Sequence, residues 1–157
     1  KMQTENETKM LALLVFYLFL PVNLLNIMGG IIKKVHHVAV ICSDYAKSLE
    51  FYTNVLGLEV VAENYREERQ SYKTDLALNG EYIIELFSFP SPAKRPSYPE
   101  AVGLRHLAFE VADIDKAAAF LERKGIEHQE IRIDGYTGKR FFFFEDPDGL
   151  PLEFYEL

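Results

Sequence analysis

Apolar and polar positions repeat in the same order twice along the chain after Gly30. Residues 36–52 read HHVAVICSDYAKSLEFY, and residues 105–121 read RHLAFEVADIDKAAAFL. Aligned without a gap, the two segments share a histidine, an alanine, an aspartate, a lysine and a phenylalanine, and His37 falls on His106. Self-similarity at a fixed spacing indicates a duplicated structural unit. The pattern therefore predicts two copies of one folding unit.

Each copy begins with an apolar strand followed by an amphipathic helix. The strands are expected at about 35–42 and 104–111, and each ends at an aspartate suited to cap a helix, Asp44 or Asp113. Gly57 and Gly125 follow the helices at the position where a left-handed residue commonly ends them. The remaining strands are predicted at 58–66, 72–79 and 82–88 in the first copy, and at 126–133, 139–145 and 151–156 in the second.

Turn signals complete each unit. Asn79-Gly80 and Asp148-Gly149 are typical of hairpin turns between the last two strands. The segment SFPSPAKRPSYPEAVG, which contains four prolines, joins the two copies. The fold class is therefore α+β, with two tandem βαβββ modules at about 35–90 and 104–157.

The last strand of each module carries a carboxylate between apolar residues. Glu85 lies within YIIELFSF and Glu153 within LPLEFYEL, and the spacing from histidine to glutamate is 48 residues (85 − 37) and 47 (153 − 106). An unpaired buried carboxylate is costly unless it is neutralised. A divalent cation bound by His37, Glu85, His106 and Glu153 would remove that cost, because two carboxylates balance its charge. The alternative is two buried Glu–His or Glu–Arg pairs without a metal.

Neighbouring side chains are assigned by the alternation of faces along a strand. His36 is expected to point away from His37, and His128 is expected to be solvated. In TGKRFFFF, Phe141 and Phe143 share one face and 142 and 144 share the other, so that one pair lines the pocket and the rest pack in the core.

Composition narrows the functional classes. The 157 residues carry a net charge of −7 and no basic cluster, which disfavours nucleic-acid binding. Cys42 is the single cysteine, so an internal disulfide is excluded and a reducing, cytoplasmic location is expected. The sequence contains no P-loop, no GxGxxG and no GxSxG motif.

The first thirty residues differ from the rest. KMQTENETKM is polar and LALLVFYLFL is apolar, but ten apolar residues are too few to span a bilayer as a helix. Residues 1–30 are expected to form an extension outside the domain at 31–157. Its origin stays open between translation upstream of Met28, a membrane or export signal, and a packed helix.

Together these motifs resemble the vicinal oxygen chelate superfamily, in particular its glyoxalase I-like branch. The resemblance implies two βαβββ modules that form a cupped mixed sheet around one metal ion, with ligands at His37, Glu85, His106 and Glu153. It further implies a lyase that isomerises the hemithioacetal of methylglyoxal and glutathione through a metal-stabilised enediolate, and thus methylglyoxal detoxification. Nickel or zinc is the expected metal, with cobalt, manganese or iron as alternatives. Glu153 is the expected general base, with Glu85 as the second choice.

Several alternatives remain at this stage. The same scaffold supports ring-cleaving dioxygenases, thiol transferases and non-catalytic antibiotic-binding modules. The cup is completed either within one chain or by exchange between two chains of a homodimer. No clear clamp for a glutathione carboxylate is found, although five cations have positions from which they could face the cup: Arg69, Lys73, Arg95, Lys139 and Arg140.

Overall fold

The computed structural model describes residues 31–157, and the expected extension at 1–30 lies outside that range. Residues 36–157 form one compact unit. Among residues 31–157, no helix combines the length and the apolar character needed to span a membrane.

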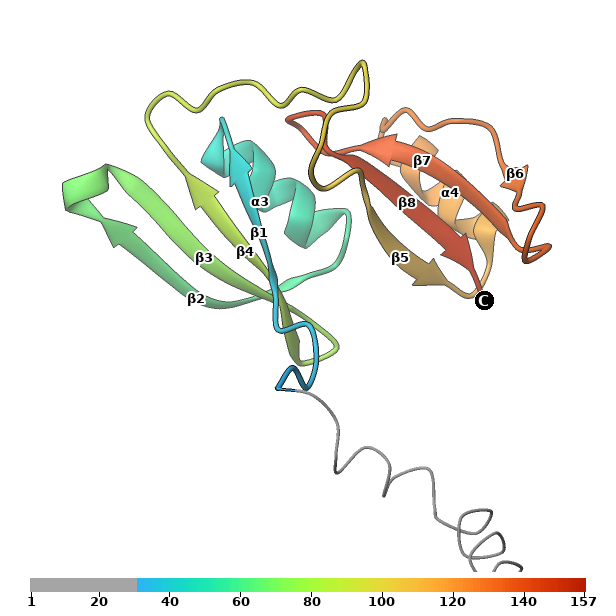
Figure 1. Cartoon of the computed structure of the whole chain (residues 1–157), viewed down its shortest axis with the longest axis horizontal. Helices are drawn as coiled ribbons and strands as arrows, with labels where there is room; N and C mark the ends of the chain where they lie inside the picture. The colour runs from blue at the N-terminus through green and yellow to red at the C-terminus, as the bar shows by residue number, and fades with distance from the viewer. Residues whose placement is uncertain (1–30) are drawn as a thin grey trace, which may run out of the picture. The chain divides into compact units, whose positions relative to one another are not determined.

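The first module is a four-stranded mixed sheet with one helix (Figure 1). Its strand order is β1-β4-β3-β2, in which β1 runs parallel to β4 and the other neighbours are antiparallel. The elements are β1 (Val38–Cys42), α3 (Tyr45–Asn54), β2 (Glu59–Arg66), β3 (Ser71–Leu78) and β4 (Glu81–Ser88). This is the predicted βαβββ order.

The second module repeats that topology in the order β5-β8-β7-β6. Its elements are β5 (Leu107–Val111), α4 (Ile114–Arg123), β6 (Arg132–Ile133), β7 (Arg140–Glu145) and β8 (Pro151–Glu156). The α+β class and the duplication are therefore confirmed. The strand predicted at 126–133 is wrong over most of its length, because only its last two residues pair as a ladder with β7. The run Glu127-His128-Gln129-Glu130 has no apolar alternation and makes only an isolated bridge, between His128 and Phe144.

Both helices begin and end where the sequence indicates. The side chains of Asp44 and Asp113 accept hydrogen bonds from the backbone N–H of the residue three positions on, at 3.1 and 3.0 Å. Gly57 and Gly125 follow the helices with φ of 72° and 70°, a conformation that glycine adopts without a steric cost. The turn at Asn79-Gly80 also has two positive φ values, as a type I′ hairpin requires.

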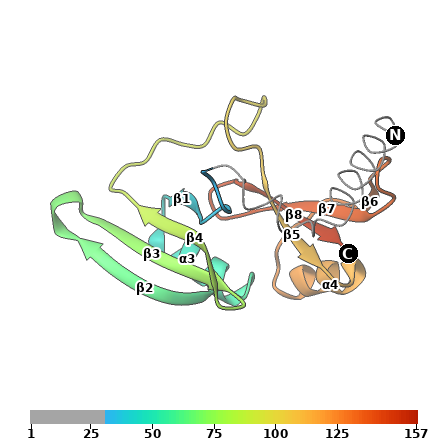
Figure 2. The ribbon, with the colours of Figure 1, turned by 60° about the horizontal axis from the view of Figure 1, so that its bottom comes forward.

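Each sheet uses one face for the core. The helix of each module lies beside its own sheet (Figure 2) and covers the side chains that are most completely buried. Buried residues of the shared core include Tyr52, Leu76, Leu86, Leu121, Phe142 and Leu152. The predicted division of the phenylalanines is confirmed, since Phe142 and Phe144 are buried in this core.

The two modules are joined by buried and exposed hydrogen bonds. The hydroxyl of Tyr52 on α3 donates to Oδ2 of Asp146, which follows β7, at 2.9 Å. The backbone N–H of Ser43 donates to Oδ2 of Asp148 at 3.0 Å. The helix of the first module is therefore fixed to the β7–β8 turn of the second.

Candidate metal centre

The first histidine–glutamate pair lies on the sheet face that α3 does not cover. His37 comes directly before β1, and Glu85 lies on the neighbouring strand β4, where it is the register partner of Ala39. Nε2 of His37 is 3.3 Å from Oε2 of Glu85. The ring of Tyr82 stacks on the imidazole at 5.1 Å between centroids, which fixes the plane of the ring.

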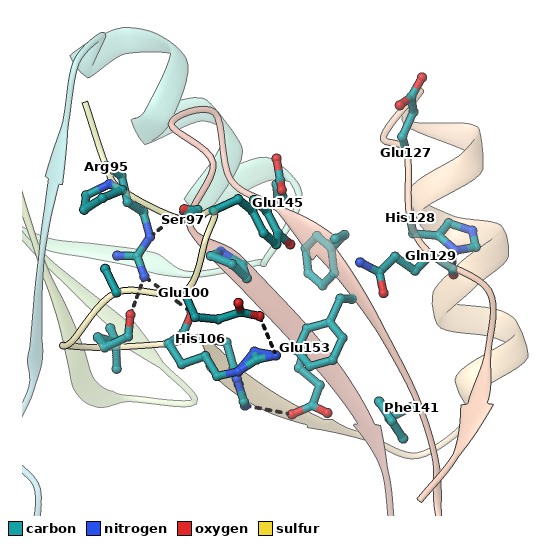
Figure 3. A pocket seen from close by; sticks show the side chains of 18 of the residues that line it. Arg95, Ser97, Glu100, His106, Glu127, His128, Gln129, Phe141, Glu145 and Glu153 are labelled. Carbon is teal, nitrogen blue, oxygen red and sulfur yellow. Dashed lines mark hydrogen bonds and ion pairs between the residues drawn. The ribbon is translucent and has the colours of Figure 1, made fainter.

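The second pair has the same construction in the other module. His106 comes directly before β5, and Glu153 on β8 is the register partner of Ala108. Nε2 of His106 lies 3.2 Å from Oε2 of Glu153 (Figure 3). The ring of Phe143 meets the imidazole edge-on at 5.2 Å. The repeated spacing in the sequence therefore corresponds to a repeated side-chain arrangement.

The geometry of both pairs suits ligands of one cation. Nitrogen and carboxylate ligands lie about 2.0–2.2 Å from a zinc-like ion. Two such ligands are then about 3.0 Å apart at a right angle and about 3.4 Å apart at a tetrahedral angle. The observed distances of 3.3 and 3.2 Å fall between these limits. Moreover, Nδ1 of His106 is buried without a hydrogen-bond partner among residues 31–157, so His106 is not an ordinary satisfied core histidine.

The two pairs do not meet within the described part of one chain. Among residues 31–157, no group of three or more histidine, cysteine, aspartate or glutamate side chains is placed to hold a metal ion. The four predicted ligands are thus brought together two by two. Each pair supplies half of a four-ligand set.

A lysine makes the two pairs chemically different. Nζ of Lys73 lies 2.7 Å from Oδ1 of Asp75 and 2.7 Å from Oε1 of Glu85. The hydrogen bond from Lys73 is the main cause that lowers the pKa of Glu85, against the opposing effect of burial. In the second module Phe143 takes the place of Asp75 opposite the glutamate. Glu153 therefore has an aromatic neighbour where Glu85 has an ion pair.

Two expectations about histidines are wrong. His36 does not point away from His37, because their Nδ1 atoms are 2.8 Å apart. Both residues precede β1, so the alternation of a strand does not apply to them. His128 is not solvated: its side chain is only 15% exposed and its ring packs on Phe142 at 4.8 Å.

The cations expected near the cup separate into distinct roles. Arg140 pairs with Glu156 and Asp115, and Arg69 and Lys139 are exposed and do not line the pocket that contains His106. Arg95 lines a pocket of about 860 Å³ that also contains His106 and Glu153 (Figure 3). Phe141 and Phe143 line this pocket, as the alternation predicts.

Sequence reasoning missed Arg132 and Tyr82. Arg132 lines the same pocket because the β6–β7 register places it opposite Phe141. Tyr82 reaches His37 from the start of β4. Both depend on strand register, and the sequence contains no separate signal for it.

Comparison with known proteins places these features in a family. Residues 34–154 match the model of the Glyoxalase/Bleomycin resistance protein/Dioxygenase superfamily. The uncharacterized protein YwkD of Bacillus subtilis is 62% identical over 126 residues, which cover 80% of this chain and 98% of YwkD. The crystal structure of a glyoxalase family protein from Enterococcus faecalis is 48% identical, with a TM-score of 0.75 over 81% of this chain and 100% of that one.

A relative with a named activity is more distant. The lactoylglutathione lyase of Schizosaccharomyces pombe is 31% identical over 141 residues, covering 76% of this chain and 46% of that enzyme. The duplicated βαβββ fold, the family match over most of the chain and these relatives agree with one another. The chain belongs to the glyoxalase/bleomycin resistance/dioxygenase, or vicinal oxygen chelate, superfamily.

Proposed function

We propose that this protein is a metal-dependent lyase or isomerase of the glyoxalase I type, which moves a proton next to a substrate carbonyl. The observation that carries the proposal is the pair of matched His–Glu arrangements, His37–Glu85 and His106–Glu153, at equivalent positions of the two modules. Their donor atoms suit one divalent cation, and two carboxylates balance its charge. Nickel and zinc are the leading candidates, with cobalt, manganese and iron as alternatives.

The complete site is proposed to form between two copies of the chain. Each copy carries one His–Glu pair on each sheet, and each pair is a half-set of the four ligands. Within residues 31–157 the two half-sets stay separate. A twofold dimer brings the His37–Glu85 face of one chain against the His106–Glu153 face of its partner, and the symmetry generates two equivalent sites. The protein is thus proposed to act as a homodimer.

The asymmetry between the half-sets supports different roles for the two glutamates. Glu85 is held by Lys73 at 2.7 Å and acts as a fixed ligand. Glu153 has one polar side-chain contact among residues 31–157, to His106, and is free to turn toward a substrate proton as general base. Phe143, opposite Glu153 on β7, limits the access of water to that carboxylate. A bound divalent cation supplies Lewis-acid stabilisation of the negative charge that develops on substrate oxygens.

The hemithioacetal of methylglyoxal and glutathione is the proposed substrate. The relative that supports this choice is the lactoylglutathione lyase of Schizosaccharomyces pombe, at 31% identity. The proposed location is the cytoplasm. Cys42 agrees with a reducing compartment, since it is fully buried and unpaired.

Metal analysis of the purified protein, followed by the methylglyoxal–glutathione assay with Ni²⁺ or Zn²⁺ restored, tests the proposal. We expect about one metal ion per chain and turnover that depends on it. Glu153→Gln should lower turnover by about 10²-fold or more while the protein stays folded, because the amide cannot accept the proton. Glu50→Gln is the matched control, since Glu50 is exposed on α3, away from the His–Glu pairs.

The other functions of this scaffold give different outcomes. Bound metal without turnover of the hemithioacetal would replace the proposed reaction by dioxygenase or thiol-transferase chemistry. A protein that is fully stable and binds no metal would instead be a small-molecule binding module. Wild-type activity in Glu153→Gln would remove Glu153 from the mechanism.

A further inference from the structure

Three arginines line the pocket beside His106 and Glu153, and two of them contact the connector between the modules. The guanidinium of Arg95 donates to the hydroxyl of Ser97 and to the carbonyl oxygen of Leu104 (Figure 3). Arg105 lies 3.8 Å from a carboxylate oxygen of Glu100. Both cations therefore hold the connector that forms one wall of the pocket.

Arg132 is the pocket arginine whose guanidinium has neither an anionic partner nor a backbone carbonyl acceptor among residues 31–157, whereas Arg95 is held by backbone carbonyls and Arg105 lies near Glu100. It forms none of the ion pairs found between residues 31 and 157, and its one hydrogen-bond acceptor is the neutral side-chain oxygen of Gln129, at 3.0 Å. Glu127 and Glu145 also line the pocket, yet neither is within ion-pair distance of this guanidinium. A planar guanidinium with free donors is suited to bind a carboxylate or phosphonate through two hydrogen bonds.

Two phenylalanines lie close to that guanidinium. Its central carbon lies 5.0 Å from the ring centre of Phe141 and 5.5 Å from that of Phe143. This cation–π arrangement favours a position of the exposed guanidinium over an apolar surface. The same surface continues to the metal-binding pair, because Phe143 is opposite Glu153 in the β7–β8 register and contacts the ring of His106.

We propose that Arg132 is the specificity-determining residue of the pocket and that it binds an acidic group of the substrate. The substrate class is then an organic acid that carries a carboxylate, as the proposed glutathione adduct does, or a phosphonate, and its apolar portion packs on Phe141 and Phe143. Its reacting oxygens face His106 and Glu153. This inference rests on the proposed function in one respect, since it places the reacting end of the substrate at the proposed metal ligands.

Binding of phenylphosphonate and phenylacetate to the full chain, in EDTA and followed by NMR titration, tests the acidic subsite without the metal. Benzyl alcohol serves as the uncharged probe. We expect Arg132→Gln to weaken both acids by about tenfold or more while leaving benzyl alcohol unchanged, because only the charged hydrogen bonds are removed. Arg132→Lys should bind the acids with intermediate affinity, since it keeps the charge and loses the planar pair of donors.

Arg123→Gln is the matched control, because it removes the same charge from the end of α4 and does not line the pocket. Equal weakening in Arg123→Gln and Arg132→Gln would reduce the effect to general charge and overturn the proposal. Unchanged acid binding in Arg132→Gln would also overturn it. Acid binding that depends on Arg132, in a protein that takes up no Ni²⁺ or Zn²⁺, would overturn the proposed metal chemistry and leave the acidic subsite intact. Metal uptake by a protein that does not bind the acids would overturn the acidic subsite and leave the proposed metal chemistry intact.

Discussion

Asp146 is a buried acceptor on which the junction between the two modules depends. Its carboxylate accepts hydrogen bonds from the Tyr52 hydroxyl at 2.9 Å and from the backbone N–H groups of Asp148 and Leu150 at 2.9 and 2.8 Å. Asp146→Ala leaves three donors without that acceptor, and Tyr52 is fully buried, so water cannot replace it. Each buried donor without an acceptor costs about 1–3 kcal/mol. Part of the summed cost is offset, because the variant no longer buries a carboxylate. We therefore expect a loss of about 2–4 kcal/mol in the free energy of unfolding.

Asp146→Asn separates the acceptor from the charge. The amide oxygen still accepts from the two backbone N–H groups, and its NH₂ group donates to the Tyr52 oxygen. The free energy of unfolding at pH 7 should stay within about 1 kcal/mol of the wild type. Urea unfolding followed by circular dichroism measures the free energy of unfolding of both variants, since the chain has no tryptophan for fluorescence. An Asn variant as unstable as the Ala variant would refute the reasoning.

The wild type and Asp146→Asn should differ in how the free energy of unfolding depends on pH, and the sign of that difference follows from the pKa of Asp146. Burial raises the pKa of Asp146, against the lowering effect of its hydrogen bonds. The folded state therefore binds this proton more tightly than the unfolded state does. The resulting stabilisation is complete below the ordinary aspartate pKa and is lost as the pH rises through the raised value. Relative to Asp146→Asn, the wild type should gain stability as the pH falls below neutrality.

Two further outcomes follow from single side chains. Lys73→Met leaves Asp75 and Glu85 as opposed carboxylates on neighbouring strands. The melting temperature should therefore fall, consistent with a penalty of about 0.2–1 kcal/mol in the free energy of unfolding. Added Ni²⁺ or Zn²⁺ should raise the melting temperature of this variant more than that of the wild type. Lys73→Arg is the control that keeps the charge, and a melting temperature of Lys73→Met that ignores added metal would contradict this account. Burial raises the pKa of the Cys42 thiol to about 11, so iodoacetamide at pH 8 should label it only after unfolding in urea; rapid labelling of the folded protein would contradict its burial.

Local chemistry in the sequence was enough to predict most of the helices and strands. Asp44 and Asp113 cap helices because their carboxylates reach the free N–H groups of the first turn, a contact that needs only neighbouring residues. Phe142 and Phe144 separate from Phe141 and Phe143 because a strand alternates its faces. The repeat placed a histidine and a glutamate at equivalent positions of the two modules, and two separate Glu–His pairs were the alternative to a four-ligand site; within residues 31–157 the side chains form those two pairs.

Long-range register accounts for what the sequence could not supply. Lys73 contacts Glu85, and Arg132 lies opposite Phe141, only because particular strands pair in particular registers. His36 and His37 precede β1 rather than lying within it, so the alternation of side chains along a strand does not turn His36 away from His37. The assembly of the two half-sets into one centre also lies beyond a single chain's pattern, and it stays a proposal.

That assembly has a decisive test in mixed dimers. His37→Ala breaks one half-set and His106→Ala breaks the other, so each variant alone should bind little metal and have little turnover. In a twofold dimer that shares its sites, a mixed dimer of the two variants places both lesions in one site and leaves the other site intact. After unfolding and refolding together in equal amounts, half of the dimers are mixed, and about one quarter of wild-type metal binding and turnover should return. If each chain completed its own site, every site would carry a lesion and mixing would restore nothing.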